Sequence, residues 1–524
     1  MAAGMQRVEV VEGDDDDVTL PGDPSSGGRP DDDARTAPGR VPDDGAGPAP
    51  RRGRGSRRGW LVVLAGLLVL VVGLVVGQAV IDARHRAQVA RWGKVPGVLA
   101  PIGDRLTVAG ELPTPGDWLA VVPGADGAVG TFAVGRHVAD DGSTHAYGVD
   151  VLTGGEAWAV TLDTPAPERA DERVWVTQPC VVDEVEAGGP LVCLVTDRVR
   201  GWDDQGGLAT LRSGRTGSVV VIDVDSGQAR RWDAEPADGV QLFGDLAVTS
   251  LTLGTRPGPG PSVRLIAYDV RTGERRWSTT VTVPVPAVGG MPTDASFEDV
   301  ANVSVGGGLL LVSSMYGTGM VALDASGQVA ELPPDAVSST WFDRHTALMG
   351  GAGTTVLVRD GVVVASARGG GVIPTVDDGS SDIALLTVDD GLRAWGTGGE
   401  KLWHLRGVEP SEAILLGGGV YVVDGKDVVA VDARTGTERW RRAMLTDVSE
   451  DFYAGLVTDG RRLYVTLNDA TGDGEVRVTA VDLGGEEITE VALPPGTQHI
   501  YPGARALWNS RWTDEGAGSL SLLR

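Results

Sequence analysis

The sequence predicts an all-β protein: a β-propeller of seven or eight blades, with eight favoured, preceded by one transmembrane helix and a disordered N-terminal tail. Three observations support this prediction. A phrase built from Asp, Thr-Gly or Ser-Gly, and Trp returns along most of the chain. One long apolar run stands near the N-terminus, and the residues before it contain almost no large apolar side chains. Short Val-rich runs broken by Gly and Asp indicate many short strands joined by turns.

Residues 1–59 form the predicted tail. They contain the acidic runs Asp14–Asp17 and Asp31–Asp33 among repeated Pro, Gly and Ala. Such a composition buries too little apolar surface to offset the entropy lost on ordering, so we expect disorder. The acidic runs lack the ligand spacing of a cation site, and we interpret them as solvated.

Residues 60–81, WLVVLAGLLVLVVGLVVGQAVI, contain only one strongly polar side chain, Gln78. A helix of this length spans the hydrocarbon core of a bilayer, so we predict an uncleaved signal anchor. The basic residues are denser before the run than after it, which favours a cytoplasmic N-terminus and an extracytoplasmic propeller in the cell membrane. Residues 82–98 are predicted to be a short helical stalk, and residues 99–524 the propeller.

The repeated phrase appears in its fullest form as IAYDVRTGERRW (266–277) and VAVDARTGTERW (429–440). When its aspartate, or Trp395 in one copy, is taken as a marker, the markers fall at 150, 223, 269, 324, 395, 432 and 482. Spacings near 40–50 residues are typical of propeller blades. The long step from 324 to 395 holds a further strand pair, TALMGG and TTVLVRDGVVVASA, which we count as an eighth blade. The final strands, in 499–523, are expected to close the ring against the N-terminal part of the propeller.

Each phrase predicts one hairpin. The aspartate ends a strand and bonds to amides of the turn, the glycine provides a positive φ, and the tryptophan of the returning strand packs between adjacent blades. The residues assigned these structural roles are Asp150, Trp158, Asp223, Trp232, Asp269, Gly273, Trp277, Asp324, Trp403, Asp432, Gly436, Trp440 and Asp482. Recurrence at a fixed position favours packing over ligand stacking for these tryptophans.

The pattern D-x-x-T-G-x-x-x-W after a Val-rich strand resembles the PQQ-like (quinoprotein-type) propeller repeat, over residues 140–490 or so. Quinoprotein alcohol dehydrogenases and the lipoprotein scaffold of the outer-membrane barrel assembly machine share that repeat. The resemblance implies the propeller fold. The enzymes hold pyrroloquinoline quinone (PQQ) against a disulfide of adjacent cysteines, beside a calcium ion, whereas Cys180 and Cys193 are the only cysteines here and are not adjacent. We therefore expect no PQQ, calcium or other cofactor, no metal site and no catalytic residues.

Cys180 and Cys193 flank a Glu-Ala-Gly-Gly-Pro turn between two strand-like runs. A hairpin there brings them opposite each other, which predicts a disulfide outside the cytoplasm. Two buried thiols in one blade are the alternative.

The formal net charge is −27, and nearly all of it falls after the apolar run. An acidic body repels phosphate backbones, so we expect no nucleic-acid partner. The bias toward Ala, Gly, Arg and Asp is typical of a GC-rich genome, and we expect a bacterial source. The sequence favours a membrane-tethered module that binds or scaffolds a protein or cell-envelope ligand. The alternative is a divergent quinoprotein-like oxidoreductase, or another enzyme, that uses the propeller funnel.

Overall fold

The computed structural model describes residues 67, 78, 87 and 91–524, apart from 115–117, 123–131, 139–142, 163–173, 176–179, 183–188, 203–207, 254–260, 285–300, 315–318, 334–337, 342–344, 352, 445–451, 470–475 and 513–517. The chain divides into two compact units, Met1–Val76 and Gly77–Arg524. The predicted tail and the predicted span lie outside the described residues, except for Leu67 and Gln78, which are helical. In the described part of the chain, no helix is both long and apolar enough to cross a membrane.

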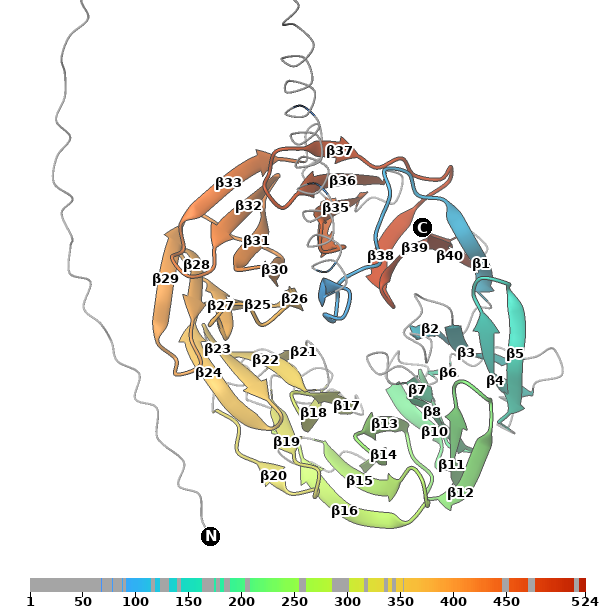
Figure 1. The fold of residues 1–524 in the computed structure, drawn as a ribbon. Coiled ribbons are helices and arrows are strands. Elements are labelled where there is room, and N and C mark those ends of the chain that lie inside the picture. Colours follow the sequence, from blue (N-terminus) through green and yellow to red (C-terminus); the bar gives the residue numbers. More distant parts are fainter. Residues whose placement is uncertain are drawn as a thin grey trace, which may run out of the picture. The chain divides into compact units, whose positions relative to one another are not determined.

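The second unit is a β-propeller, as the sequence predicts (Figure 1). The predicted blade number was wrong: the described strands form nine four-stranded blades rather than seven or eight, and one blade carries an additional inner strand. The uncounted blade is the one that closes the ring. Its fourth strand comes from the N-terminal side of the chain, so no complete four-stranded unit appears in the C-terminal sequence.

Within each blade we number the strands from the centre of the ring outward. Blade 1 contains β2 (Trp118–Val122), β3 (Phe132–Val138), β4 (Thr144–Asp150) and β5 (Gly155–Thr161). Blade 2 contains β7 (Cys180–Val182), β8 (Pro190–Thr196), β11 (Gly217–Asp223) and β12 (Ala229–Ala234). Blade 3 contains β13 (Gly239–Phe243), β14 (Leu246–Leu253), β15 (Ser262–Asp269) and β16 (Arg275–Thr282).

Blade 4 contains β17 (Ala301–Gly306), β18 (Leu309–Ser314), β19 (Met320–Leu323) and β20 (Val329–Ala330). Blade 5, which has lost the repeated phrase, contains β21 (Ser338–Trp341), β22 (Thr346–Gly351), β23 (Thr354–Arg359) and β24 (Val362–Arg368). Blade 6 contains β25 (Gly370–Val372), β27 (Leu385–Val388), β28 (Gly391–Trp395) and β29 (Lys401–Arg406).

Blade 7 contains β30 (Ala413–Leu416), β31 (Gly419–Asp424), β32 (Asp427–Asp432) and β33 (Glu438–Ala443), with β26 (Pro374–Asp377) added in parallel to β30. Blade 8 contains β34 (Phe452–Thr458), β35 (Arg462–Asp469), β36 (Arg477–Asp482) and β37 (Ile488–Glu490). Blade 9 contains β38 (His499–Gly503), β39 (Ala506–Trp512), β40 (Gly518–Leu523) and, outermost, β1 (Val108–Thr114). Three further strands, β6 (Val174–Trp175), β9 (Val199–Trp202) and β10 (Leu208–Arg212), form a separate sheet.

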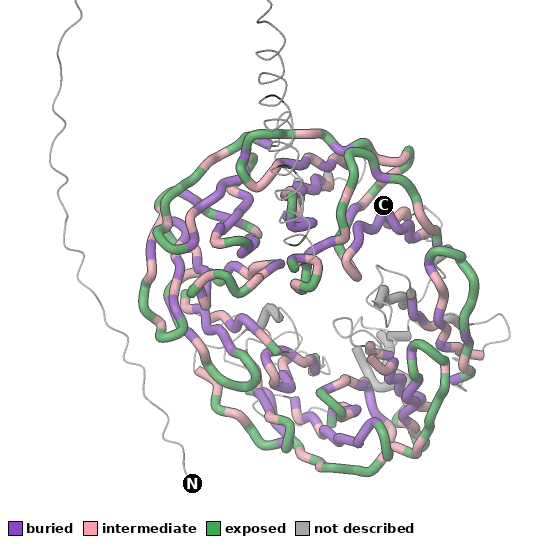
Figure 2. Tube along the Cα trace, viewed as in Figure 1, coloured by how far each residue is buried: buried purple, intermediate pink, exposed green. Residues whose placement is uncertain are grey.

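The middle strands of a blade are buried on both faces and therefore read as unbroken apolar runs. In β31, GVYVVD, five consecutive residues are buried. The outer strands face solvent and carry charge: β33, ERWRRA, has no buried residue. Figure 2 shows this gradient, with buried chain inside the blades and exposed chain around the rim.

The hairpin turns of a blade, between its first and second strands and between its third and fourth, lie on the same side of the ring. In blade 7 the amide of Ala433 bonds to the carbonyl of Gly418 (3.1 Å), which joins the two turns. In blade 3 the amide of Val270 bonds in the same way to Asp245 (2.9 Å). We call this side the turn face.

Candidate functional site

The predicted aspartates all cap the turn that follows their strand. Asp432 Oδ1 accepts hydrogen bonds from the amides of Arg434 (3.1 Å) and Thr435 (3.0 Å). Asp269 Oδ1 binds the amides of Arg271 and Thr272 in the same way, each at 3.0 Å. The same role is filled by Asp150, Asp223, Asp324 and Asp482. These carboxylates are committed to local backbone geometry.

Two of these carboxylates also bind an arginine of the following outer strand. Arg439 donates to Asp432 Oδ2 at 2.7 Å, and this bond lowers the pKa of Asp432 to about 2. Arg276 does the same for Asp269 at 2.6 Å and holds the pKa of that carboxyl well below its usual range. In blades 3 and 7, this arginine of the outer strand is therefore already paired with the carboxylate of the turn.

The five predicted tryptophans lie between adjacent blades, each against the turn glycine of the next blade. The indole of Trp403 lies on Gly436, and that of Trp232 on Gly273. The other three pairs are Trp158 with Gly227, Trp277 with Gly327, and Trp440 with Gly485. A β-carbon on any of these glycines would come within 2.8 Å of the ring. Only glycine also accepts the positive φ of these positions without strain.

Four of the five indoles donate their N–H to a carbonyl of the next blade. The bonds run from Trp158 to Val224 (2.7 Å), Trp277 to Ala325 (2.9 Å), Trp403 to Ala433 (2.7 Å) and Trp440 to Leu483 (3.1 Å). Trp232 is the exception, since its buried N–H has no partner among the described residues. The geometry assigns all five to inter-blade packing, with Trp158 and Trp403 buried and the other three half-buried.

Cys180 and Cys193 stand directly opposite each other on β7 and β8 and form a disulfide, with both residues buried. This bond joins the two inner strands of blade 2. It therefore crosslinks blade 2 next to the connections that, among the described residues, carry an additional sheet.

That sheet, β10-β9-β6, which we call the accessory sheet, is built from two connections of blade 2. The strand β6 lies in the connection from blade 1, and β9 and β10 lie between β8 and β11. Val174 pairs with Gly201 and Leu208 with Trp202, so segments from both connections are held in one sheet. The excess length between the markers at 150 and 223 was the sequence signal of this insertion.

A buried ion pair fixes the accessory sheet to blade 3. Arg198, next to β9, binds Asp238 at 2.5 Å, and the two side chains are only 10% and 6% exposed. Asp238 also accepts the amide of Thr252 (2.7 Å). At the base of the insertion, the Thr216 amide bonds to Asp197 (2.8 Å) and lowers the pKa of that carboxyl. Buried charges of this kind are stable only when additional bonds hold their geometry, and here the bonds to Thr252 and Thr216 supply that support.

The inner edges of blades 7 and 8 are covered by the chain itself. The strand β26 lies inside the ring beside β30 (Figure 1). The Thr375 hydroxyl reaches the carbonyls of Ala413 (3.4 Å) and Leu456 (3.3 Å). Glu412 accepts the amide of Leu456 at 2.5 Å, and burial raises the pKa of its carboxyl.

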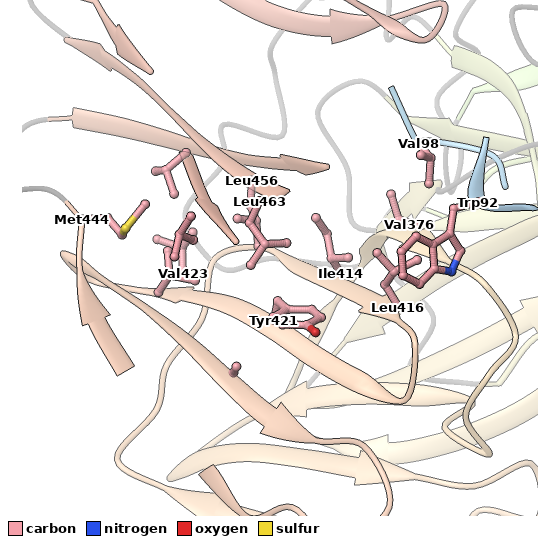
Figure 3. Packing of buried hydrophobic residues seen from close by; sticks show 14 of the residues in the cluster. Trp92, Val98, Val376, Ile414, Leu416, Tyr421, Val423, Met444, Leu456 and Leu463 are labelled. Carbon is pink, nitrogen blue, oxygen red and sulfur yellow. The ribbon is translucent and has the colours of Figure 1, made fainter. Parts of the chain in front are cut away.

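A buried cluster extends from these strands to Trp92 and Val98, residues of the segment that the sequence predicts as a stalk (Figure 3). Trp92 is 6% exposed and shares this cluster with Val376 and Leu416. No signal in the local sequence marks Trp92 as a core residue, because its partners lie some 300 positions further along the chain.

The disulfide differs from the adjacent-cysteine disulfide that the resemblance implies beside PQQ. The described disulfide joins strands within one hairpin rather than neighbouring residues. Among the described residues, no group of three or more His, Cys, Asp or Glu side chains is placed to hold a metal ion.

A family model described as outer membrane protein assembly factor BamB matches residues 265–465 and 388–521. No curated protein matches the chain. Among solved structures, BamB from Moraxella catarrhalis is 18% identical, with a TM-score of 0.31 over 62% of this chain and 94% of that chain. A quinohemoprotein alcohol dehydrogenase, ADHIIG from Pseudomonas putida HK5, is 14% identical, with a TM-score of 0.31 over 79% of this chain and 84% of that chain. TolB from Acinetobacter baumannii is 14% identical, with a TM-score of 0.23 over 52% and 79%.

Proposed function

Because the chain belongs to the PQQ-like repeat family of β-propellers, we propose that it is a binding and scaffolding module for a protein or cell-envelope ligand. In this proposal residues 60–81 tether it to the cell membrane, with the N-terminus in the cytoplasm and the propeller outside. The match to a model described as an assembly factor supports a role in holding other proteins.

The accessory sheet is the observation that carries the proposal. Its base is held by the Cys180–Cys193 disulfide and by the buried pair of Arg198 and Asp238. A surface that is rigid before binding loses little conformational entropy when a partner docks. A hairpin connection would suffice to build blade 2, so the additional strands serve no need of the ring. We assign the ligand-binding surface to this sheet.

Two features support a non-catalytic role without a cofactor. The Asp side chains of the repeat cap turns, and its Trp side chains pack between adjacent blades. The cysteine arrangement and the described acidic side chains do not match a quinone and calcium site.

The test is photo-crosslinking in cells. A photoreactive residue at Thr210 of β10 is compared with one at Ser366, an exposed residue of β24 in blade 5. We expect a distinct product from Thr210 that is absent from Ser366. The captured partner, once purified, should bind the wild-type chain saturably and bind an Arg212→Glu variant at least about tenfold more weakly, a loss of about 1.4 kcal/mol.

Identical products from both positions, or unchanged affinity in Arg212→Glu, would contradict the assignment. Addition of PQQ and calcium ions to the purified chain tests the alternative that the protein is an enzyme. Dye reduction together with a bound quinone chromophore would favour an oxidoreductase over a scaffold.

A further inference from the structure

We call the interface between two adjacent blades a seam. The seam between blades 8 and 9 is packed differently from the five seams that a tryptophan fills. The outer strand of blade 8, β37, has the sequence ITE and contains no tryptophan. Its place in the seam is taken by Leu99 and Leu106, which precede β1 and are 3% and 2% exposed. They share one buried cluster with Val457 of blade 8 and Ile500 of blade 9.

Main-chain hydrogen bonds tie this segment to both blades. Leu99 N–H bonds to the carbonyl of Thr458 in blade 8 (2.8 Å), and Ala100 N–H to that of Arg505 in blade 9 (2.8 Å). Further out, Leu106 N–H bonds to the carbonyl of Ala492 (2.8 Å). The segment therefore runs along the seam and joins its two sides.

Side chains of blade 8 hold the same segment at its middle. The carboxylate of Asp459, 3% exposed, accepts the amide of Ile102 (3.2 Å) and the hydroxyl of Tyr464 (2.9 Å). The Tyr464 hydroxyl also reaches the Ile102 carbonyl (3.1 Å). Arg462 binds Asp104 at 2.5 Å. Burial raises the pKa of Tyr464, so its hydroxyl remains a donor throughout the usual pH range.

Trp92 stands at the start of the segment, on the turn face of blades 7 and 8. A β-carbon on Gly460 would lie 3.0 Å from Trp92, and one on Gly417 would lie 3.4 Å away. Both glycines belong to the turns between the first and second strands of their blades. Trp92 is therefore buried among residues of blades 7 and 8 (Figure 3), and the chain continues from it to the seam.

We propose that residues 91–107 form a latch that closes the seam between blades 8 and 9, and that tension on the chain before residue 91 releases it and opens this seam before any other. Trp92 bears the load first, because it is the first buried side chain among the residues that the structure describes. The bonds of residues 99–107 and then the pairing of β1 with β40 follow. The proposed tether supplies the tension and is the only part of the proposed function on which this inference rests.

Hydrogen exchange on the full chain in lipid nanodiscs tests the latch. Trp92→Ala should raise the exchange of β1 and β40 amides about tenfold or more, since both strands depend on the closed seam. Trp277→Ala, which empties the seam between blades 3 and 4, is the matched control and should leave β1 and β40 protected. Increased exchange confined to residues 91–98 in Trp92→Ala, or equal effects of the two variants on β1 and β40, would overturn the proposal.

Single-molecule stretching tests the order of release, with handles at residue 82 and at the C-terminus of the full chain. Release of residues 92–107 should give a first extension of roughly 50 Å before any larger one. In Trp92→Ala this step should occur at lower force. Unfolding of the whole ring in one event, with no early step, would refute the latch. Neither experiment involves a binding partner, so failure here is distinguishable from failure of the scaffold proposal.

Discussion

The indole of Trp403 lies so close to Gly436 that a β-carbon on residue 436 would come within 2.7 Å of the ring. One blade supplies the ring and the next supplies the glycine, and the indole N–H also bonds to Ala433 beside that glycine. Each such pair therefore joins two adjacent blades through residues of the repeated phrase. Substitution of either residue tests its contribution to stability.

Gly436→Ala should destabilise the propeller by about 2–4 kcal/mol, because it adds an indole clash to the strain of a positive φ. Gly425→Ala is the matched control: its φ of 58° is similar to the 71° of Gly436, but nothing lies within 4 Å of the added carbon. We expect about 1 kcal/mol for the control. Chemical denaturation measures the free energy of unfolding of both variants. Equal losses would show that the contact between Trp403 and residue 436 tolerates the additional methyl group.

Trp403→Phe should cost about 1–3 kcal/mol, since it removes the indole bond and leaves the Ala433 carbonyl buried without its donor. Trp232→Phe is the comparison, because the N–H of Trp232 has no partner among the described residues. It should lose less stability than Trp403→Phe. If the two variants are equally affected in thermal or chemical unfolding, the hydrogen bond contributes nothing measurable.

The disulfide of blade 2 closes a short loop, with a sequence separation of 13 residues. Its removal in a Cys180→Ala/Cys193→Ala variant should lower stability by about 2–4 kcal/mol, mainly through the larger entropy of the unfolded chain. Mass spectrometry of the wild-type chain, with and without reductant, checks that the bond is present. Hydrogen exchange should then show the change concentrated in blade 2, and an unchanged β7–β8 pair would argue against a bracing role.

The carboxyls of Asp432 and Glu412 should give opposite pH dependences. The folded-state pKa of Asp432 is lowered to about 2, chiefly by the bond from Arg439. Its stabilising effect is therefore complete above the unfolded pKa near 3.8 and is lost as the pH falls toward 2. Asp432→Asn should be less stable than wild type at pH 7, and the difference should shrink between pH 4 and pH 2.

Burial raises the pKa of Glu412, so its charged form is disfavoured in the folded state. Glu412→Gln keeps an acceptor for the Leu456 amide and removes the charge. It should raise the melting temperature at pH 7, and the gain should diminish as the pH falls toward the unfolded pKa of Glu412. A melting temperature that falls at pH 7 would mean that the carboxylate is needed for its charge.

The propeller could be predicted because its signal is local and repeated. Asp432, Gly436 and Trp440 sit within nine positions, and each blade needs the same hairpin. Blade 5 has lost this phrase for a tight Asp360-Gly361 turn, yet its Val-rich strands still identified it. Blade 9 was not counted because β1 completes it from the other end of the chain.

In blade 6 we interpreted Trp395 as the equivalent of the aspartate in the repeated phrase, which is one position too early. The structure puts Gly396 where other blades have aspartate: the amide of Gly396 bonds to the Glu400 carbonyl (2.9 Å), as Asp432 bonds to Thr437 (2.9 Å). Glu400 takes over the capping role through the Gly398 amide (2.9 Å). Trp395 instead packs toward blade 5, in a cluster with Ala365.

The contacts around the candidate site and the latch were beyond sequence reasoning because they join distant positions. Arg198 and Asp238 are forty residues apart on different blades, and Trp92 meets glycines at 417 and 460. No periodicity marks either set. An isolated arginine or tryptophan in a loop becomes informative only when the ring brings its partner close.

Because Val108 pairs with Leu523, β1 cannot form its native pairing until β40 has been synthesised. β1 is synthesised before the other strands of its blade, and its partner strand β40 follows roughly 400 residues later, a delay of about 20–80 s at ordinary rates of translation. Throughout that interval β1 has an open edge, and the nascent chain must keep it from pairing elsewhere. A transcript truncated anywhere before the final strands would yield an open arc of blades, a substrate for quality control rather than a smaller propeller.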